Sequence, residues 1–240
     1  MFAWFLPQQC LWCQLAATSG DEHLCNFCQQ ALPKLTLAWV EGNALALPAI
    51  AKGLTPRHFD RLYSLSWYQL PWSHWIGRWK FQQDFACGAL LCQQLQQACQ
   101  HYLCLGLDLP QAVCFVPISR QRKQQRGFNQ AEVLASVIAT TLNRPLLRLF
   151  IHQGHRTHQV GLNRQQRSAN LRRQFRLHSH DIPYTRLLLV DDVITTGATI
   201  NRLCTLLRRA GVSQIDVWTL AVTPAERRRP MYTLTSNRPS

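Results

Sequence analysis

The sequence predicts an α/β fold, a parallel sheet flanked by helices, with a small four-cysteine module at the N-terminus. Two observations indicate this. Strand and helix patterns alternate after Pro110, and Leu187–Val190 is an uninterrupted apolar run, as a strand buried on both faces of a parallel sheet requires. Two C-x-x-C pairs lie near the start of the chain. With 240 residues, the chain can build one core and a small appendage.

The chain is strongly basic, with a formal net charge of +14 from 26 Lys and Arg against 12 Asp and Glu. Such a charge attracts nucleic acid, acidic membrane surfaces or phosphorylated small molecules, although a solvated basic surface is the alternative. No run approaches the ~20 apolar residues of a membrane span. Met1–Leu6 also lacks the basic region of a secretory signal. We therefore expect a cytoplasmic protein whose ten cysteines stay reduced.

The two cysteine pairs predict a structural zinc site in a module over residues 1–34. Each C-x-x-C turn aims two thiolates at one point, and two such turns form a tetrahedral site. Zinc–thiolate bonds would replace the core that so short a segment cannot build. A redox pair and small buried cysteines are the alternative interpretations. The expected ligands are Cys10, Cys13, Cys25 and Cys28.

Residues 35–105 predict a mainly helical connecting segment. Residues 35–61 carry faint signals and are expected to be irregular, and residues 61–68 alternate weakly, as a strand does. Trp72, Trp75, Ile76 and Trp79 then share one face of a helix, which favours core packing over stacking of nucleobases. A second helix, from Asp84 to Tyr102, carries an apolar stripe and glutamines that we expect to face water.

Residues 106–224 predict the main α/β domain, and residues 225–240 a basic tail. In order, we expect a strand at 112–116, a basic Gln-rich loop at 120–126, a helix capped by Asn129, a strand at 146–151, a polar loop at 152–176 running into a short helix, a helix at 198–210 ended by Gly211, and an alternating last strand at 215–222. Strands joined by helices are typical of a parallel sheet.

The strongest functional signal follows the apolar strand. Asp191 and Asp192 come at its carboxyl end, where open α/β sheets bind their ligands. Vicinal ribose hydroxyls and a divalent cation suit two adjacent carboxylates. The next residues, Thr195-Thr196-Gly197-Ala198-Thr199, turn sharply at Gly197 and direct N–H groups into a concavity at a helix N-terminus. Such a loop binds a phosphate.

This run resembles the phosphoribosyl pyrophosphate (PRPP) fingerprint of type I phosphoribosyltransferases. The resemblance extends over nearly the whole chain to the competence protein F (ComF) family, whose members are associated with natural transformation, DNA uptake and use of DNA as a nutrient. The matching segments are the cysteine pairs, Trp79–Asp84, Val116–Ser119, Arg126–Gln130 and the loop from Gln159 to Leu171. The resemblance to this family implies a type I phosphoribosyltransferase-like (Rossmann-like) parallel sheet with an N-terminal zinc knuckle. Many members carry further zinc-type cysteines, but none lies here between Cys28 and Cys87.

The resemblance also implies the site residues. PRPP, with Mg²⁺, would be bound by Asp191, Asp192, Thr195, Thr196, Gly197, Ala198 and Thr199. A pyrophosphate-contacting loop and a flexible closing loop would supply Pro117, Ile118, Ser119, Arg126, Gln159, Arg164 and Arg167. Cationic side chains there would steady the departing pyrophosphate.

Two classes of function stay open at this point. In the first, the protein is an enzyme that transfers phosphoribose from PRPP to an unidentified acceptor, or runs the reverse phosphorolysis. In the second, it is a non-catalytic protein that senses PRPP or nucleotides and binds single-stranded DNA, helicases or recombination proteins. The sequence favours ligand binding more than catalysis, because no segment is typical of a base-specific pocket.

Overall fold

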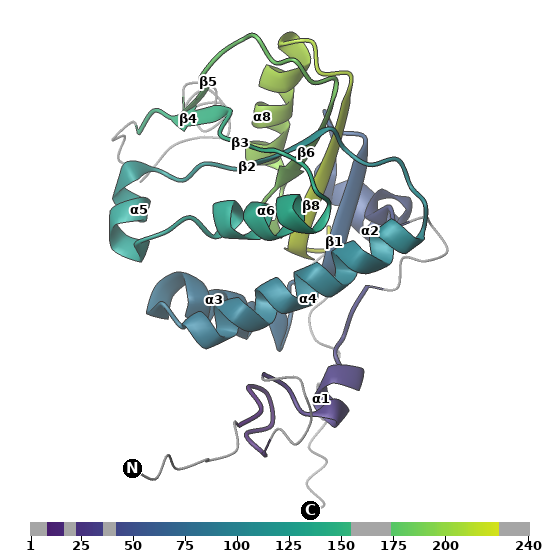
Figure 1. Ribbon diagram of the computed structural model, residues 1–240, viewed down its shortest axis with the longest axis vertical. Coiled ribbons are helices and arrows are strands. Elements are labelled where there is room, and N and C mark those ends of the chain that lie inside the picture. Colours follow the sequence, from purple (N-terminus) through teal and green to yellow (C-terminus); the bar gives the residue numbers. More distant parts are fainter. Residues whose placement is uncertain (1–8, 17–22, 36–41, 155–173, 226–240) are drawn as a thin grey trace, which may run out of the picture.

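The core of the molecule is a six-stranded parallel sheet (Figure 1). The computed structural model describes residues 9–16, 23–35, 42–154 and 174–225. The strand order is β1-β8-β6-β2-β3, and β7 pairs with the end of β8. The strands are β1 (Arg61–Trp67), β2 (Ala112–Phe115), β3 (Leu146–Leu147), β6 (Arg186–Val190), β7 (Val193–Ile194) and β8 (Gln214–Val222). Every pair in this sheet is parallel, which confirms the predicted fold class.

Two crossover helices leave the middle of the sheet, at β2 and β6, in opposite directions. Helix α6 (Gln130–Thr141) connects β2 to β3, and α8 (Ala198–Arg209) leads from β6 and β7 to β8. The two connections run in opposite directions along the sheet, so right-handed crossovers bring the helices to opposite faces. The strand order reverses between β2 and β6. In open α/β sheets, the carboxyl ends of strands at such a point flank the binding crevice.

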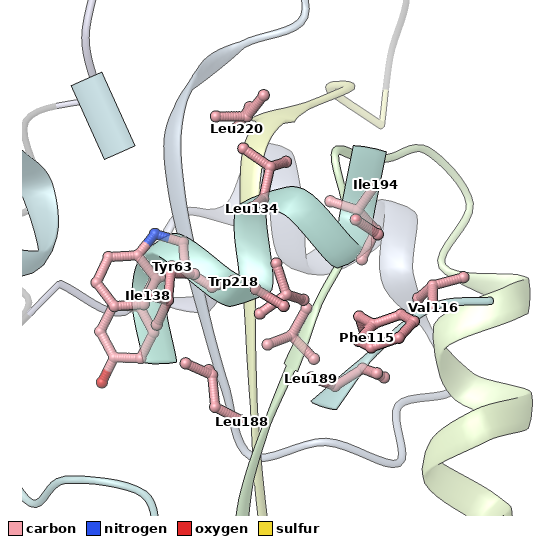
Figure 2. Packing of buried hydrophobic residues seen from close by; sticks show 14 of the residues in the cluster. Tyr63, Phe115, Val116, Leu134, Ile138, Leu188, Leu189, Ile194, Trp218 and Leu220 are labelled. Carbon is pink, nitrogen blue, oxygen red and sulfur yellow. The ribbon is translucent and has the colours of Figure 1, made fainter. Parts of the chain in front are cut away.

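The last strand is buried along almost its whole length, where an alternating pattern was expected. Every residue of β8 after Gln214 is buried, including Asp216 and Thr219. The reason is its position between β1 and β6, with side chains packed on both faces. Figure 2 shows this core, where Leu134 and Ile138 of α6 lie over the sheet near Leu189 and Trp218.

The segment 35–105 contributes a strand and two long helices. The strand expected at 61–68 is β1, and it pairs in parallel with β8. Helix α3 (Trp72–Gln82) buries its whole tryptophan stripe, which confirms core packing. Helix α4 (Phe85–Cys104) begins at the cap Asp84. Of its glutamines, Gln94 is buried and donates to Gln29, contrary to the expectation that all face water. Figure 1 shows α3 and α4 side by side below α6.

Residues 42–60, expected to be irregular, contain three short helical turns, η2 (Ala44–Ala46), α2 (Pro48–Ala51) and η3 (Lys52–Leu54). The division at residues 34, 105 and 224 stays a prediction, and the strand β1 before residue 105 belongs to the same sheet as β8 after it. No helix in the described ranges is both long and apolar enough to cross a bilayer.

The segment 120–126 is a helix, α5 (Arg120–Arg126), and the expected loop is wrong there. All its residues lie at the surface, so no apolar period announces it. Its ends fix it instead, because Ser119 accepts from the Arg122 amide at 3.2 Å and Gly127 closes the helix at φ +79°.

The strand expected at 146–151 is two strands in two sheets. β3 joins the main sheet, whereas β4 (Phe150–His152) pairs antiparallel with β5 (Phe175–Leu177). At the end of the expected polar loop, Phe175–Leu177 form the strand β5, because Phe175 and Leu177 are buried and pair with β4. The short helix expected in this segment falls mostly outside the described residues, and Gln174, directly before β5, is helical.

Helix α1 (Asn26–Gln30) and the cysteine turns form the N-terminal module, which contacts α3. The Trp75 indole donates to the Leu11 carbonyl at 3.3 Å, and its ring meets Trp12 edge to face. The Trp72 indole donates to the Pro33 carbonyl at 3.1 Å. The N-terminal module is thus hydrogen-bonded to α3, the helix that follows strand β1.

Candidate functional site

The four N-terminal cysteines converge on one point. Their sulfur atoms all lie within 4.8 Å of one another, and the sulfurs of Cys13 and Cys25 are 3.7 Å apart. A tetrahedral zinc–thiolate site with Zn–S bonds of ≈ 2.3 Å implies sulfur–sulfur distances of roughly 3.8 Å. Burial opposes ionisation of Cys10, but amides of Cys13, Cys25 and Trp12 outweigh it and lower its pKa to about 6. This cluster could hold a metal ion such as zinc.

The acid pair lies at the predicted edge of the sheet. The register aligns Phe115 of β2 with Val190 of β6, so the loops after both strands begin level with each other. The backbone amide of Asp192 donates to the Asp191 carboxylate at 2.9 Å, which fixes the orientation of the Asp191 side chain. Burial, then the neighbouring Asp192 charge, raises the pKa of Asp191 to about 8. The pair therefore favours any partner that brings positive charge or hydrogen-bond donors.

A cationic side chain already meets this pair. Lys80, from the last turn of α3, lies with its Nζ 2.5 Å from Asp192 Oδ2. Both side chains are largely buried, with 17% and 11% of their surface exposed. Lys80 thus brings a charge from the segment 35–105 to the carboxyl edge of the sheet.

A polar cavity of about 840 Å³ opens beside the acid pair. Its walls are the loop after β2, helix α5, the start of α6, the β4–β5 pair and the end of β6. Asn129 holds two of these walls together, since its side chain donates to the Val116 carbonyl at 3.0 Å and accepts from the Ala131 amide at 3.1 Å. These two hydrogen bonds explain the Asn of the Arg126–Gln130 run.

Basic and amide groups line the wall opposite the carboxylates. The Arg126 guanidinium contacts the Gln130 side-chain oxygen at 3.4 Å and lies 5.0 Å from the centre of the Phe81 ring. Burial, followed by repulsion from Arg122, lowers the pKa of Arg126. The buried Gln130 Nε2 has no hydrogen-bond partner among the described residues. It is a donor that a ligand in the cavity could satisfy.

The loop expected to bind phosphate has the geometry that its glycine predicts. Gly197 adopts φ +68° and serves as the N-cap of α8 without a side-chain hydrogen bond to the first turn. The amides at this helix N-terminus are thus not capped by the preceding side chain. A Cβ at this position would also lie 3.0 Å from Leu54 Cδ2, so a larger residue would combine backbone strain with a tight contact.

Comparisons with known proteins identify the family of this chain. The phosphoribosyl transferase domain profile matches residues 126–237. Competence protein F of Haemophilus influenzae is 33% identical over 90% of this chain and 98% of its own length. The chain belongs to the competence protein F family. A second relative, DNA utilization protein YhgH of Salmonella typhimurium, is 30% identical over 91% of this chain and 98% of its own length.

A solved structure also matches this competence protein F family member. A hypoxanthine phosphoribosyltransferase from Staphylococcus aureus is similar at 17% identity and a TM-score of 0.35, covering 57% of this chain and 68% of its own.

The structure brings together only part of the site predicted for this family member. Seven of the predicted residues line the cavity, namely Pro117, Ile118, Ser119, Arg126, Asp191, Asp192 and Thr199. Thr195, Thr196, Gly197 and Ala198 lie in the loop that joins the acid pair to α8. Gln159, Arg164 and Arg167 lie outside the described residues.

Lys80 and Gln130 also line this cavity, and the sequence alone predicted no ligand-binding role for either of them. Both belong to segments that carry the competence protein F resemblance, Trp79–Asp84 and Arg126–Gln130, and that resemblance was the available signal.

Proposed function

We propose that this chain binds PRPP together with Mg²⁺ in the cavity between β2 and β6. One observation carries the proposal, namely that the acid pair and the positive-φ loop of α8 follow the same strand at the reversal point of the sheet. Carboxylates for a sugar and amides for its phosphate are thereby only a few residues apart. The basic side chains of α5 face the same cavity and suit a pyrophosphate.

Each group has a distinct role in this proposal. Asp191 and Asp192 accept hydrogen bonds from the vicinal ribose hydroxyls. The amides and hydroxyls of Thr195, Thr196, Gly197, Ala198 and Thr199 surround the 5-phosphate, with the dipole of α8 in support. Gln130 Nε2 and Arg126 donate to the pyrophosphate. Pro117, Ile118 and Ser119 shape the loop beneath it. Gln159, Arg164 and Arg167 are proposed to close over the ligand.

The carboxylates also fit Mg²⁺, which prefers oxygen ligands and reaches such sites with phosphates. Within the described residues, the contacts to the Asp192 amide and to Lys80 occupy one oxygen of each carboxylate. The remaining oxygens suit the cation, and access to both oxygens of Asp192 would require Lys80 to move away. When bound, Mg²⁺ would neutralise charge on the pyrophosphate.

The test is calorimetry of PRPP binding with and without Mg²⁺. Asp191→Asn combined with Asp192→Asn should cost about 3 kcal/mol, roughly a hundredfold in affinity, because hydrogen bonds and cation attraction are lost together. Asp108→Asn is the matched control, since it removes a carboxylate that is 76% exposed and lies outside the cavity lining. Unchanged PRPP affinity in the double variant would refute the site.

The biological role that we propose is DNA uptake or the use of DNA as a nutrient, in a reducing cytoplasm. Two relatives are named for competence and for DNA utilization, and this supports the proposal. A panel of nucleobase acceptors, assayed for release of pyrophosphate from PRPP, separates the two classes of activity. Release with one acceptor identifies a phosphoribosyltransferase. Binding without release for any acceptor identifies a sensor of PRPP or nucleotides.

We further propose that the four-cysteine cluster holds one structural zinc. The geometry of the four sulfurs supports thiolate ligation. Zinc would stabilise the turns from which Leu11 and Trp12 reach Trp75 of α3.

Direct binding of single-stranded DNA is the second candidate function, with helicase and recombination proteins as the accompanying protein partners. Helix α5 exposes Arg120, Arg122 and Lys123, and nearby Phe81 and Phe85 are 74% and 66% exposed. Basic groups neutralise phosphates, and aromatic rings stack bases. The Arg126 contact to Phe81 links the two kinds of side chain. The basic tail, 226–240, lies outside the described residues.

Anisotropy titrations of a labelled single-stranded oligonucleotide at several salt concentrations test this second function. Arg122→Gln with Lys123→Gln should reduce the logarithmic salt slope by about 1.4, because each phosphate contact contributes ≈ 0.7 for single strands. Phe81→Ala should weaken binding by about 1–3 kcal/mol with the slope retained. Absence of binding at low salt would make any role in DNA uptake indirect.

A further inference from the structure

Lys80 reaches the acid pair from a helix that belongs to neither crossover connection. Its ammonium contacts Asp192 Oδ2 at 2.5 Å, and the contact is mostly shielded from water. A shielded ion pair of this kind is strong only while both partners keep their geometry. The position of the end of α3 therefore determines whether Lys80 stays in contact with Asp192.

The end of α3 is fixed by packing on both sides of Lys80. The neighbouring Trp79 ring is 2% exposed and lies so close to Gly88 of α4 that a Cβ there would be 2.5 Å from the indole nitrogen. On its other side, the Trp79 ring lies 5.6 Å from the Phe128 ring.

Two further contacts lock the helix end. The Arg78 guanidinium pairs with Asp84 at 2.7 Å, and Gln83 closes α3 in the left-handed conformation at φ +56°. Lys80 is thus held by the structure around it and is not a freely moving surface lysine.

The ammonium contacts Asp192 Oδ2, an oxygen for which a divalent cation at the acid pair would have to compete. Asp191 already uses one oxygen for the Asp192 amide, and Asp192 uses Oδ2 for Lys80. The other charged groups that face the cavity are Arg120, Arg122 and Arg126, and all of them repel a second cation. A lone Mg²⁺ would have to displace Lys80 into this positive field.

We propose that Lys80 is a positioning residue that acts as the resident counter-ion of the acid pair. It holds Asp192 in the ligand-free protein and excludes a lone divalent cation. It releases the carboxylate only when a phosphorylated ligand brings both the cation and the negative charge that the freed ammonium needs. The inference rests on the proposed function, since it describes how cation and ligand enter that site together.

The experiment is a titration with Mn²⁺ alone, followed by electron paramagnetic resonance of the free ion. Lys80→Gln should bind Mn²⁺ at least about tenfold more tightly than the unchanged chain, because a competing charge at contact distance is gone. Lys80→Arg, which keeps the charge, should behave like the unchanged chain. Lys52→Gln is the matched control, since Lys52 is exposed and lies outside the cavity lining.

Adding Asp192→Asn to Lys80→Gln should abolish the gain. Lys80→Met repeats the test if the glutamine variant fails to fold. Equal Mn²⁺ affinity in Lys80→Gln and the unchanged chain overturns the inference, as does a gain in Lys80→Arg. Because no PRPP is present, the result is separate from the proposed function. If Lys80→Gln binds Mn²⁺ more tightly but the chain does not bind PRPP, the counter-ion role is supported and the proposed ligand is wrong. If the chain binds PRPP but Lys80→Gln binds Mn²⁺ no more tightly, only the counter-ion role is refuted.

Discussion

At the scale of single residues, two glycines flank α8 with positive φ, and only one of them belongs to the site. Gly197 is the N-cap at φ +68°, and Gly211 follows the C-cap at φ +90°. An alanine strains both positions, so each substitution should lower the free energy of unfolding by about 1 kcal/mol in denaturant titrations. Gly197→Ala should also push Leu54 aside and weaken PRPP binding, measured by calorimetry.

Gly211→Ala is the control for strain, because a Cβ there meets nothing within 4 Å. It should keep the PRPP affinity of the unchanged chain. Equal losses of affinity in both variants would mean that strain in α8, and not the phosphate loop, governs binding. Gly197→Val should be the most damaging change, since a β-branched residue resists positive φ more strongly.

Asp216 gives the stability of the chain a pH dependence. Burial raises the pKa of this β8 carboxyl to about 6, well above its value in an unfolded chain. The folded state therefore holds the proton more tightly, and the free energy of unfolding falls as the pH rises from about 4 to about 6. Asp216→Asn should remove this cost and stabilise the protein by roughly 3 kcal/mol at pH 7.

The check is denaturant unfolding of both proteins at pH 4 and pH 7. The advantage of Asp216→Asn should disappear at pH 4, where the carboxyl is protonated in the folded state. Asp108→Asn, which removes an exposed carboxyl, controls for the change in net charge. A stabilisation of the same size at both values of pH would assign the effect to packing.

At the scale of elements, two helix glycines in α3 and α4 should respond in opposite ways to the same change. Alanine in a helix interior is favoured over glycine by about 1 kcal/mol. Gly77 of α3 has nothing within 4 Å of an added Cβ, so Gly77→Ala should stabilise the chain by up to that amount. Gly88 of α4 faces the Trp79 indole, and overpacking costs about 1–3 kcal/mol, so Gly88→Ala should destabilise it.

Thermal unfolding of the two variants measures these signs directly. Because Trp79 precedes Lys80, Gly88→Ala should also disturb the ion pair with Asp192, and Gly77→Ala should not. If Gly88→Ala stabilised the chain instead, the contact between Gly88 and Trp79 would not be tight enough to penalise a methyl group.

The elements that the sequence predicted are those with an internal signal. The tryptophan stripe of α3, the apolar stripe of α4 and the apolar run of β6 could all be recognised from local pattern. Helix α5 could not, because it buries none of its residues and its ends alone define it. The division of residues 146–151 between β3 and β4 depends on partner strands far along the chain. The contact of Lys80 with Asp192 is tertiary for the same reason.

At the scale of the whole molecule, the cysteine module and the α/β core should differ in their dependence on metal. Protein purified without added metal should contain about one zinc per chain by elemental analysis. Cys25→Ser should lose it and expose α3 amides near Trp75 to hydrogen exchange, because the module supports that helix through Leu11. The amides of β6 and β8 should stay protected, since their pairing does not involve the module.

Cys104→Ser is the matched control, as Cys104 is an exposed cysteine outside the cluster. It should leave zinc content and exchange unchanged. A folded, protected N-terminal module with no metal would end the zinc proposal, and loss of protection throughout β6 and β8 in Cys25→Ser would show that the core depends on the metal.

The pairing of β1 with β8 sets the order in which the nascent chain can fold on the ribosome. The Ile215 amide donates to Asp60, 155 residues earlier, and β8 separates β1 from the rest of the sheet. At 5–20 residues per second, β1 is synthesised roughly 8–30 s before its partner. Throughout that interval the strand β1 lacks the strand that later pairs with it along its whole length. During this interval the unpaired strand β1 is a target for chaperones at the ribosome. A stop codon before β8 would leave β1 unpaired permanently.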